Sequence, residues 1–310
     1  MTTRIVVGPR YPASVSSRIV TRPTLLDVVE EVTAPSGSTT HRQAAARHRP
    51  ALSPSRAADF KQCPLLYRLR AIDRIPETPT TAQARGTLVH AALENLFDLP
   101  AELRTPEAAL DLVDGAWAAI CAQAPELREL VPEDETTTFL SGAHKLMTTY
   151  FRMEDPSRFD AESCEVRVEV EIDGDVLLRG FVDRVDVAPD GRVRVVDYKT
   201  GRSPGEAFEA KALFQMKFYA LAIQRTTGTL PTRLQLMYLA DGQQLTYDPD
   251  RDEIERFGRT LAAIWRAIRT AGTTGDFRPR RSRMCSFCDH RSLCPEFGGT
   301  PPPYPGWPEP

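Results

Sequence analysis

Cysteine is scarce in this chain of 310 residues, which contains six in all. That number is too small for a fold built on disulfides, and the first residues do not resemble a signal peptide, so we expect reduced thiols and a cytoplasmic protein. No apolar run approaches 18 residues, which predicts no membrane span. The phosphate-loop pattern G-x-x-x-x-G-K-[ST] does not occur either, so the chain carries no helicase motor of its own.

Net charge is also low. The formal value of -3 at pH 7 argues against a protein that coats nucleic acid by charge alone, because non-specific affinity follows the number of phosphates neutralised. Any contact with a polyanion must therefore come from local groups of basic residues.

Two Val-rich segments, residues 180–186 and 195–200, carry the clearest chemical signal. They alternate apolar and polar residues, and the turn sequence A-P-D-G around Asp190 separates them, so we expect a hairpin of two half-buried strands. A turn centred near Asp190 sets Asp183 opposite Asp197, with Cβ atoms roughly 5 Å apart.

The faces of this hairpin matter for its chemistry. Asp197 and Lys199 point to one side of the strand and Tyr198 to the other. Asp183 and Asp197 repel each other unless a cation lies between them, and Mg2+ or Mn2+ prefers such carboxylate ligands. A lysine beside the metal would stabilise the charge that develops during phosphodiester hydrolysis. The pattern suggests a nuclease; the alternative is a set of solvent-facing charges on an ordinary hairpin.

Helical periodicity marks residues 84–97 and 212–222. His90 lies on the first helix, and Gln215 and Tyr219 share a face of the second. Alone, these would be a structural histidine and a core helix with a polar edge. The remaining pattern predicts helices over 105–152, 205–226 and 250–272, and strands over 163–187, 192–199 and 232–247.

Three cysteines, Cys285, Cys288 and Cys294, lie close together near the C-terminus, and Cys63 lies near the start of the periodic region. Four thiolates could hold a [4Fe-4S] cluster that joins the two ends of the domain. Tetrahedral Zn2+, with Cys63 or His290 as the fourth ligand, is the competing interpretation, and the spacing does not choose between them.

Arginines flank these cysteines on both sides. Arg280 and Arg281 belong to a basic run before the C-terminal three, and further arginines follow Cys63. A metal cluster that joined these segments would place both groups at one rim, where they could follow a phosphate backbone. The alternative is a set of solvated arginines on a surface loop.

Together these segments give the chain a family resemblance over residues 52–297. It resembles the RecB-family exonucleases of the PD-(D/E)XK nuclease superfamily, in particular the stand-alone iron–sulfur type with an AddB-like nuclease domain. The segments that carry the resemblance occur in the family's order: 55–67, 86–90, 180–186, 197–201, 215–219 and the three C-terminal cysteines.

The resemblance assigns roles that spacing does not. It implies that the catalytic metal is held by His90, Asp183, Asp197 and the main-chain carbonyl of Tyr198. It implies that Lys199 is the catalytic lysine and that Gln215 and Tyr219 line the site and contact DNA. It further implies that the iron–sulfur ligands are Cys63, Cys285, Cys288 and Cys294, which favours iron–sulfur over zinc. Glu165 lies near a matching segment without an assigned role.

The implied architecture is an α/β fold with a restriction-endonuclease-like core, in which a central mixed sheet is flanked by helices and closed by the four-cysteine cluster. We expect a disordered extension over 1–51, the nuclease domain over 52–297 and a flexible Pro-rich tail over 298–310. The expected function is a metal-dependent DNA exonuclease on single strands or DNA ends, in repair or recombination, with a helicase or repair protein as partner. The alternative is a non-catalytic nucleic-acid-binding subunit of a larger helicase–nuclease machine, with a structural metal cluster.

Overall fold

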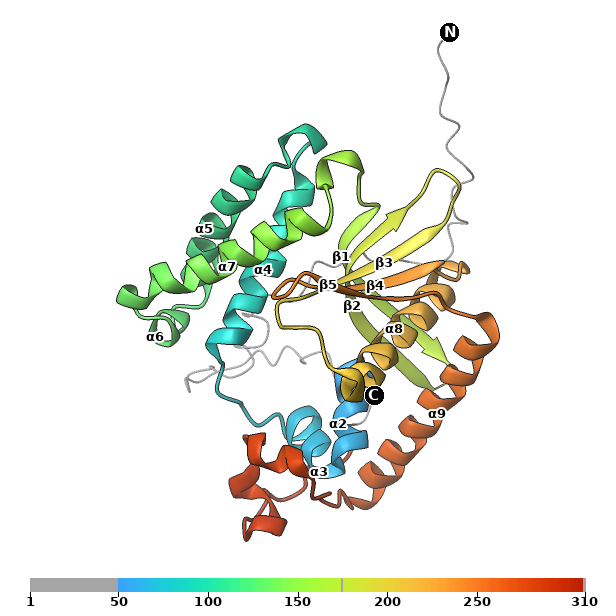
Figure 1. Cartoon of the computed structure of the whole chain (residues 1–310). Helices are drawn as coiled ribbons and strands as arrows, with labels where there is room; N and C mark the ends of the chain where they lie inside the picture. Colours follow the sequence, from blue (N-terminus) through green and yellow to red (C-terminus); the bar gives the residue numbers. More distant parts are fainter. Residues whose placement is uncertain (1–49, 174, 309–310) are drawn as a thin grey trace, which may run out of the picture.

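The computed structural model describes residues 50–173 and 175–308 (Figure 1). The predicted N-terminal extension thus lies outside the described residues, except for its last two positions. The helices are α2 Pro54–Gln62, α3 Pro64–Tyr67, α4 Thr81–Asp98, α5 Pro106–Gln123, α6 Leu127–Leu130, α7 Glu133–Met153, α8 Glu206–Thr227 and α9 Arg251–Thr274. The strands are β1 Ser163–Ile172, β2 Val176–Val187, β3 Val193–Lys199, β4 Arg233–Tyr238 and β5 Gln243–Tyr247.

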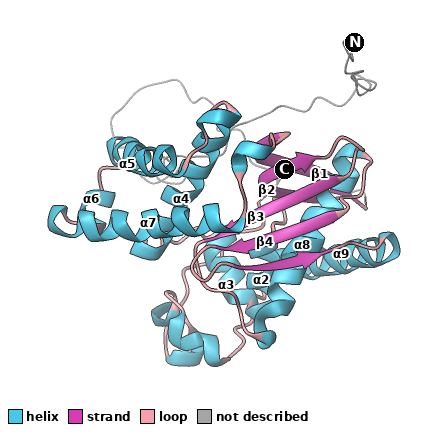
Figure 2. Cartoon of the chain, turned by 45° about the horizontal axis from the view of Figure 1, so that its top comes forward, coloured by secondary structure: helices cyan, strands magenta, loops and turns pink. Residues whose placement is uncertain are grey.

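A five-stranded sheet with the order β1-β2-β3-β4-β5 forms the centre of the molecule (Figure 2). β3 pairs in parallel with β4, and the other neighbouring pairs are antiparallel. The parallel pair requires a long crossover, and α8 provides it. The predicted mixed sheet flanked by helices is confirmed.

The hairpin of β2 and β3 has the predicted register. Arg184 pairs with Val196 and Val185 with Val195, so one further step sets Asp183 opposite Asp197. The main-chain N–H of Ala188 donates to the carbonyl of Arg192 at 2.9 Å and closes the turn. Gly191 occupies the left-handed region there, with φ 82°, a conformation that glycine adopts without steric cost.

Helices cover both faces of the sheet (Figure 1). One core joins the sheet to α8 and α9 and includes Val195 and Leu236; the other joins it to α4, α5 and α7 and includes Val196 and Met237. This alternation is the period of two expected of a strand that is buried on both faces. The helical stretch predicted over 105–152 is divided into α5, α6 and α7 near Pro125 and Pro132, because a proline inside a helix interrupts it.

The C-terminal segment returns from α9 to α2 and α3 and forms short turns over Arg283–Phe287, Arg291–Leu293 and Pro295–Phe297. The tail beyond them was expected to be flexible, but its described residues contact α9. The hydroxyl of Tyr304 donates to the carbonyl of Gly272 at 2.7 Å, and the Trp307 ring lies 6.0 Å from that of Trp265. No described helix is both long enough and apolar enough to cross a membrane.

Candidate active site

The carboxylates and the lysine of the hairpin converge on the α8 side of the sheet. The Lys199 ammonium lies 2.5 Å from Oδ2 of Asp197, whose residue is only 4% exposed. The main-chain N–H of Tyr198 donates to Oδ2 of Asp183 at 2.7 Å. The predicted arrangement of Asp183, Asp197 and Lys199 around one point is therefore present in the structure.

His90 reaches this point from α4. The helix begins at a capping box, in which the side chains of Thr80 and Gln83 each bond the main chain of the other residue. Leu88 and Val89 are buried and lie on the face of the helix that packs into the core. Nδ1 of His90 lies 3.5 Å from Oδ2 of Asp183. On the other side of the ring, Nε2 lies 3.1 Å from the carbonyl oxygen of Tyr198.

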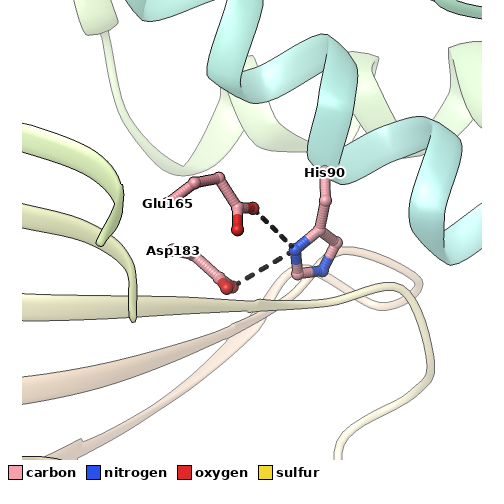
Figure 3. Close-up of side chains that lie close together, drawn as sticks. All are labelled: His90, Glu165 and Asp183. Atoms are coloured by element: carbon pink, nitrogen blue, oxygen red, sulfur yellow. Dashed lines mark ion pairs between the residues drawn. The ribbon is translucent and has the colours of Figure 1, made fainter. Parts of the chain in front are cut away.

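Glu165 is the site residue that sequence reasoning did not select. Figure 3 shows its carboxylate and that of Asp183 directed at the His90 ring, with Oε1 of Glu165 3.7 Å from Nδ1. Glu165 is 6% exposed and has a φ of 46°, which is uncommon for a residue other than glycine and costs on the order of 1–3 kcal/mol. Nothing in the local sequence signals this conformation.

The unusual backbone of Glu165 coincides with a change of face in the strand pair. Val166 and Val182 pack on the α8 side, whereas Arg184, two residues further along β2, lies on the opposite side with Tyr150 of α7. Residues i and i+2 of a regular strand share a face. The irregularity therefore lies where Glu165 and Asp183 turn toward His90.

The pKa values follow from burial and crowded charge. Burial raises the pKa of Asp197 to about 6, with Lys199 opposing the rise and Asp183 adding to it. Burial also opposes the ionisation of Asp183, but His90 and Lys199 hold its pKa below the usual value. Burial lowers the pKa of His90, but the carboxylates, Asp183 foremost, outweigh it and raise that pKa to about 10. The site therefore carries an excess of negative charge that favours a cation.

The donor atoms fit a divalent metal. Within the described residues, the single group of three or more His, Cys, Asp or Glu ligand atoms that all lie within 4.8 Å of one another consists of His90, Glu165 and Asp183. Nδ1 of His90 is buried and, within the described part of the chain, has no hydrogen-bond partner. Carboxylate oxygens suit Mg2+ and Mn2+, and an imidazole nitrogen suits a first-row transition metal.

Gln215 and Tyr219, one turn apart on α8, lie beside the hairpin as predicted. The Gln215 amide donates to Oδ1 of Asp197 at 2.8 Å and lies 3.5 Å from the hydroxyl oxygen of Tyr219. Gly180 of β2 permits this approach, because a Cβ atom there would lie 3.1 Å from Cε1 of Tyr219. The amide fixes the orientation of the Asp197 carboxylate.

A groove of about 840 Å³ opens over the site, between α2, α8 and the hairpin. It includes His90, Asp183, Asp197 and Lys199 in its lining. Its other lysines and arginines are Arg56, Lys61, Arg179 and Lys211. The groove is large enough for part of an extended polymer, and its basic walls suit an anionic one.

The four predicted cluster ligands line a second, smaller pocket of about 30 Å³ between α2, α3 and the C-terminal turns: Cys63, Cys285, Cys288 and Cys294. Among the described residues, no three of these sulfurs lie within 4.8 Å of one another. Two of the sulfurs accept main-chain hydrogen bonds, Cys63 from Arg280 at 3.4 Å and Cys285 from Ser282 at 3.3 Å. The structure thus brings the four thiols to one pocket without a closed cluster.

The neighbours of this pocket have separate partners. His290 is buried and forms an ion pair with Glu77, with 2.9 Å between Nε2 and Oε1. Arg280 donates from its guanidinium to the carbonyl of Lys61 at 2.7 Å and so holds the end of α2. The guanidinium of Arg281 lies 5.1 Å from the centre of the Phe297 ring. Both arginines are exposed and line the small pocket.

A family model of the PD-(D/E)XK nuclease superfamily matches residues 51–295. The chain belongs to the PD-(D/E)XK nuclease superfamily. The superfamily predicted from the motifs is confirmed, while its RecB-type, iron–sulfur subdivision stays a prediction.

Other proteins resemble this PD-(D/E)XK chain along most of its length. The Gene 69 protein of Mycobacterium phage D29 is 25% identical over 276 residues, which cover 80% of this chain and 97% of that protein. The Gene 69 protein of Mycobacterium phage L5 is 27% identical over 297 residues, with the same coverage of 80% and 97%. A crystal structure of an Eubacterium rectale protein, described as a candidate exonuclease, has a TM-score of 0.55 at 14% identity, covering 82% of this chain and 94% of that one. That last likeness shows the fold.

Proposed function

We propose that this nuclease-superfamily protein is a Mg2+- or Mn2+-dependent deoxyribonuclease, an exonuclease acting on single strands or DNA ends in cytoplasmic repair or recombination. The observation that carries the proposal is the convergence of Asp183, Asp197 and Lys199 on the floor of the 840 Å³ groove. The sequence has no phosphate-loop motor, so a helicase or another repair protein would supply unwound strands.

The groups we assign to the metal are His90, Glu165, Asp183, Asp197 and the main-chain carbonyl of Tyr198. A divalent cation bound by them neutralises phosphate charge and lowers the pKa of the attacking water. Asp197 is held in place for this role, because the Gln215 amide bonds one carboxylate oxygen and the Lys199 ammonium pairs with the other.

Lys199 and the groove act on the substrate. The Lys199 ammonium stabilises the negative charge that builds on the phosphate oxygens during cleavage, in a partly dehydrated site where such an interaction is strong. Tyr219 and Gln215 border the scissile phosphate, while Lys61 and Lys211 bind phosphates along the groove. Arg280 and Arg281 extend this basic track onto the cysteine-bearing segment.

The same proposal assigns a [4Fe-4S] cluster to the four cysteines of the small pocket, Cys63, Cys285, Cys288 and Cys294. Main-chain N–H groups directed at two of the sulfurs support it, since such bonds stabilise thiolates in iron–sulfur sites.

The test is cleavage of end-labelled single- and double-stranded DNA by full-length protein purified without oxygen, with Mg2+ or Mn2+. Asp197→Asn keeps the shape of the side chain but removes its charge, so we expect cleavage to be lost. Asp190→Asn is the matched control, because Asp190 lies exposed at the turn of the same hairpin and pairs with Arg192. This control should cleave at the wild-type rate.

The products also identify the mode of action. A ladder shortened from one labelled end gives an exonuclease and its polarity, whereas internal fragments exclude the exonuclease assignment. If iron-loaded wild-type protein binds DNA but does not cleave it with either metal, the catalytic proposal fails and the non-catalytic binding subunit takes its place. Equal rates for wild type and Asp197→Asn would refute the assigned site.

A further inference from the structure

An arginine is completely buried directly behind the hairpin. Arg184 of β2 is 0% exposed and lies on the face opposite the groove. Its guanidinium forms a two-pronged ion pair with Glu154 of α7, with one N–O distance of 3.0 Å, and its Nε lies 3.0 Å from Oδ1 of Asp186. The rings of Phe97 and Phe159 lie 4.8 and 5.0 Å from the guanidinium carbon. Burying such a charge is costly even when it is paired.

The same guanidinium also fixes the side chain of Tyr198. Its Nη1 donates to the Tyr198 hydroxyl at 2.5 Å, and the guanidinium carbon lies 5.6 Å from the ring centre. Tyr150 of α7 meets the Tyr198 ring edge to face, with 5.8 Å between the ring centres. Tyr198 is itself 3% exposed. Its ring is therefore held by a hydrogen bond at the tip and by packing around the sides.

The main chain of Tyr198 faces the other way, into the site. Its N–H donates to Asp183 at 2.7 Å, and its carbonyl oxygen lies 3.1 Å from Nε2 of His90. One residue thus connects the buried ion pair on the far face of the sheet to two of the proposed metal ligands. The Tyr198 carbonyl oxygen is itself a third proposed metal ligand.

We propose that Arg184, through the Tyr198 hydroxyl, is a positioning residue for the metal site. A hydrogen bond at the tip of a packed ring restricts rotation about the side-chain bonds and so fixes the peptide that Asp183 and His90 contact. Outer groups that orient ligands in this way typically contribute about 10- to 100-fold to metal affinity or activity. The inference rests on the proposed function, because it concerns the same site.

A purely structural role for the arginine predicts something different. The carboxylates of Glu154 and Asp186 already pair with Arg184 and also with Arg194, two charges of each sign in all. The Tyr198 hydroxyl is therefore not needed to balance charge. Tyr198→Phe removes this one hydroxyl while keeping the ring, the ion pairs and the hairpin. Any loss of metal binding in a folded Tyr198→Phe protein therefore shows that the Tyr198 hydroxyl positions the metal ligands.

Tyr150→Phe is the matched control. Its hydroxyl lies 3.4 Å from the same Nη1 of Arg184, and the residue is also buried, at 0% exposed, but its main chain belongs to α7 and not to the site. Both full-length variants are compared with wild type in Mn2+ affinity, measured by electron paramagnetic resonance without DNA, and in thermal unfolding. We expect Tyr198→Phe to bind Mn2+ about tenfold more weakly, with kcat lowered at fixed Mn2+ and the KM for DNA within about twofold of wild type.

The control variant should match wild type in Mn2+ affinity while sharing any modest drop in unfolding temperature. Equal effects of the two variants on Mn2+ affinity, or none from Tyr198→Phe, would overturn the positioning role. If Tyr198→Phe does not fold, Glu154→Gln takes its place, because it loosens Arg184 without altering Tyr198 and should also weaken Mn2+ binding. An unchanged Mn2+ affinity of Glu154→Gln would likewise refute the positioning role. Wild-type protein that neither binds Mn2+ nor cleaves DNA would instead refute the proposed function itself.

Discussion

Replacing Gly180 by alanine tests the contact between β2 and α8 that supports the site. A Cβ atom at Gly180 would lie 3.1 Å from Cε1 of Tyr219 and 3.5 Å from Cε1 of Phe218. The backbone of Gly180 lies outside the left-handed region, so alanine introduces no strain of its own. The whole effect therefore comes from the added methyl group pressing on α8.

The geometry sets the size of the effect. Overpacking a core by a methyl group costs about 1–3 kcal/mol, and exchanging glycine for alanine within a strand returns about 0.5–1 kcal/mol. The net loss in free energy of unfolding is then roughly 0.5–2 kcal/mol, or about 2–6 °C in Tm for a domain of this size. Tyr219 must move about 0.3 Å to restore a contact of 3.4 Å. If a 1 Å displacement costs about 100-fold in rate, this shift gives roughly a fourfold fall in kcat.

Calorimetry and single-turnover cleavage measure the two quantities. Gly115→Ala is the control of opposite sign, because Gly115 lies within α5 and a Cβ atom there would meet nothing within 4 Å. That change should raise the free energy of unfolding by up to about 1 kcal/mol through helix propensity and leave kcat unchanged. A Gly180→Ala protein with wild-type Tm and kcat would refute the reasoning, as would a Gly115→Ala protein that is equally impaired.

Three other changes test separate parts of the molecule. Cys63→Ser should lose bound iron and solubility, because metal binding is coupled to folding. The control Cys121→Ser, at a cysteine buried in α5, should keep its iron. Elemental analysis measures the iron, and an iron-loaded Cys63→Ser protein would show that another residue is the fourth ligand. Glu165→Gln should weaken Mn2+ binding at least tenfold, since a carboxylate aimed at His90 is lost. If calorimetric titration gave the wild-type affinity, Glu165 would not be a metal ligand. Trp307→Ala should lower the free energy of unfolding by about 2 kcal/mol, because its ring packs against α9; an unchanged denaturant midpoint would show that the tail adds no stability.

The hairpin was predictable because residues close together in the sequence determine it. The turn residues around Asp190 and the alternation of the flanking strands determine the register. From the register follow the opposition of Asp183 and Asp197 and the direction of Tyr198, which points to the other face of the sheet. The structure confirms these features. All of them depend on residues of one continuous segment, 180–200.

The parts that escaped prediction depend on distant contacts. The approach of His90 to the hairpin requires α4 to pack against the sheet, and only the family resemblance suggested it. Glu165 has a left-handed backbone, with φ 46°, and its own sequence context carries no sign of it. We expected a flexible tail because its prolines exclude helix and sheet, yet the Tyr304 hydroxyl bonds the carbonyl of Gly272 and the Trp307 ring packs against Trp265, both in α9.

The order of synthesis gives the C-terminal contacts a further meaning. The guanidinium of Arg68 donates to the carbonyl of Pro302, 234 residues later, and Arg280 bonds the end of α2 across 219 residues. At about 5–20 residues per second, a ribosome needs roughly 10–50 s to make the second partner after the first. During that interval the end of α2, one wall of the groove, lacks the hydrogen bond from Arg280. The nascent chain therefore completes this wall of the groove only after the hairpin and α8, which form the other walls, have been made.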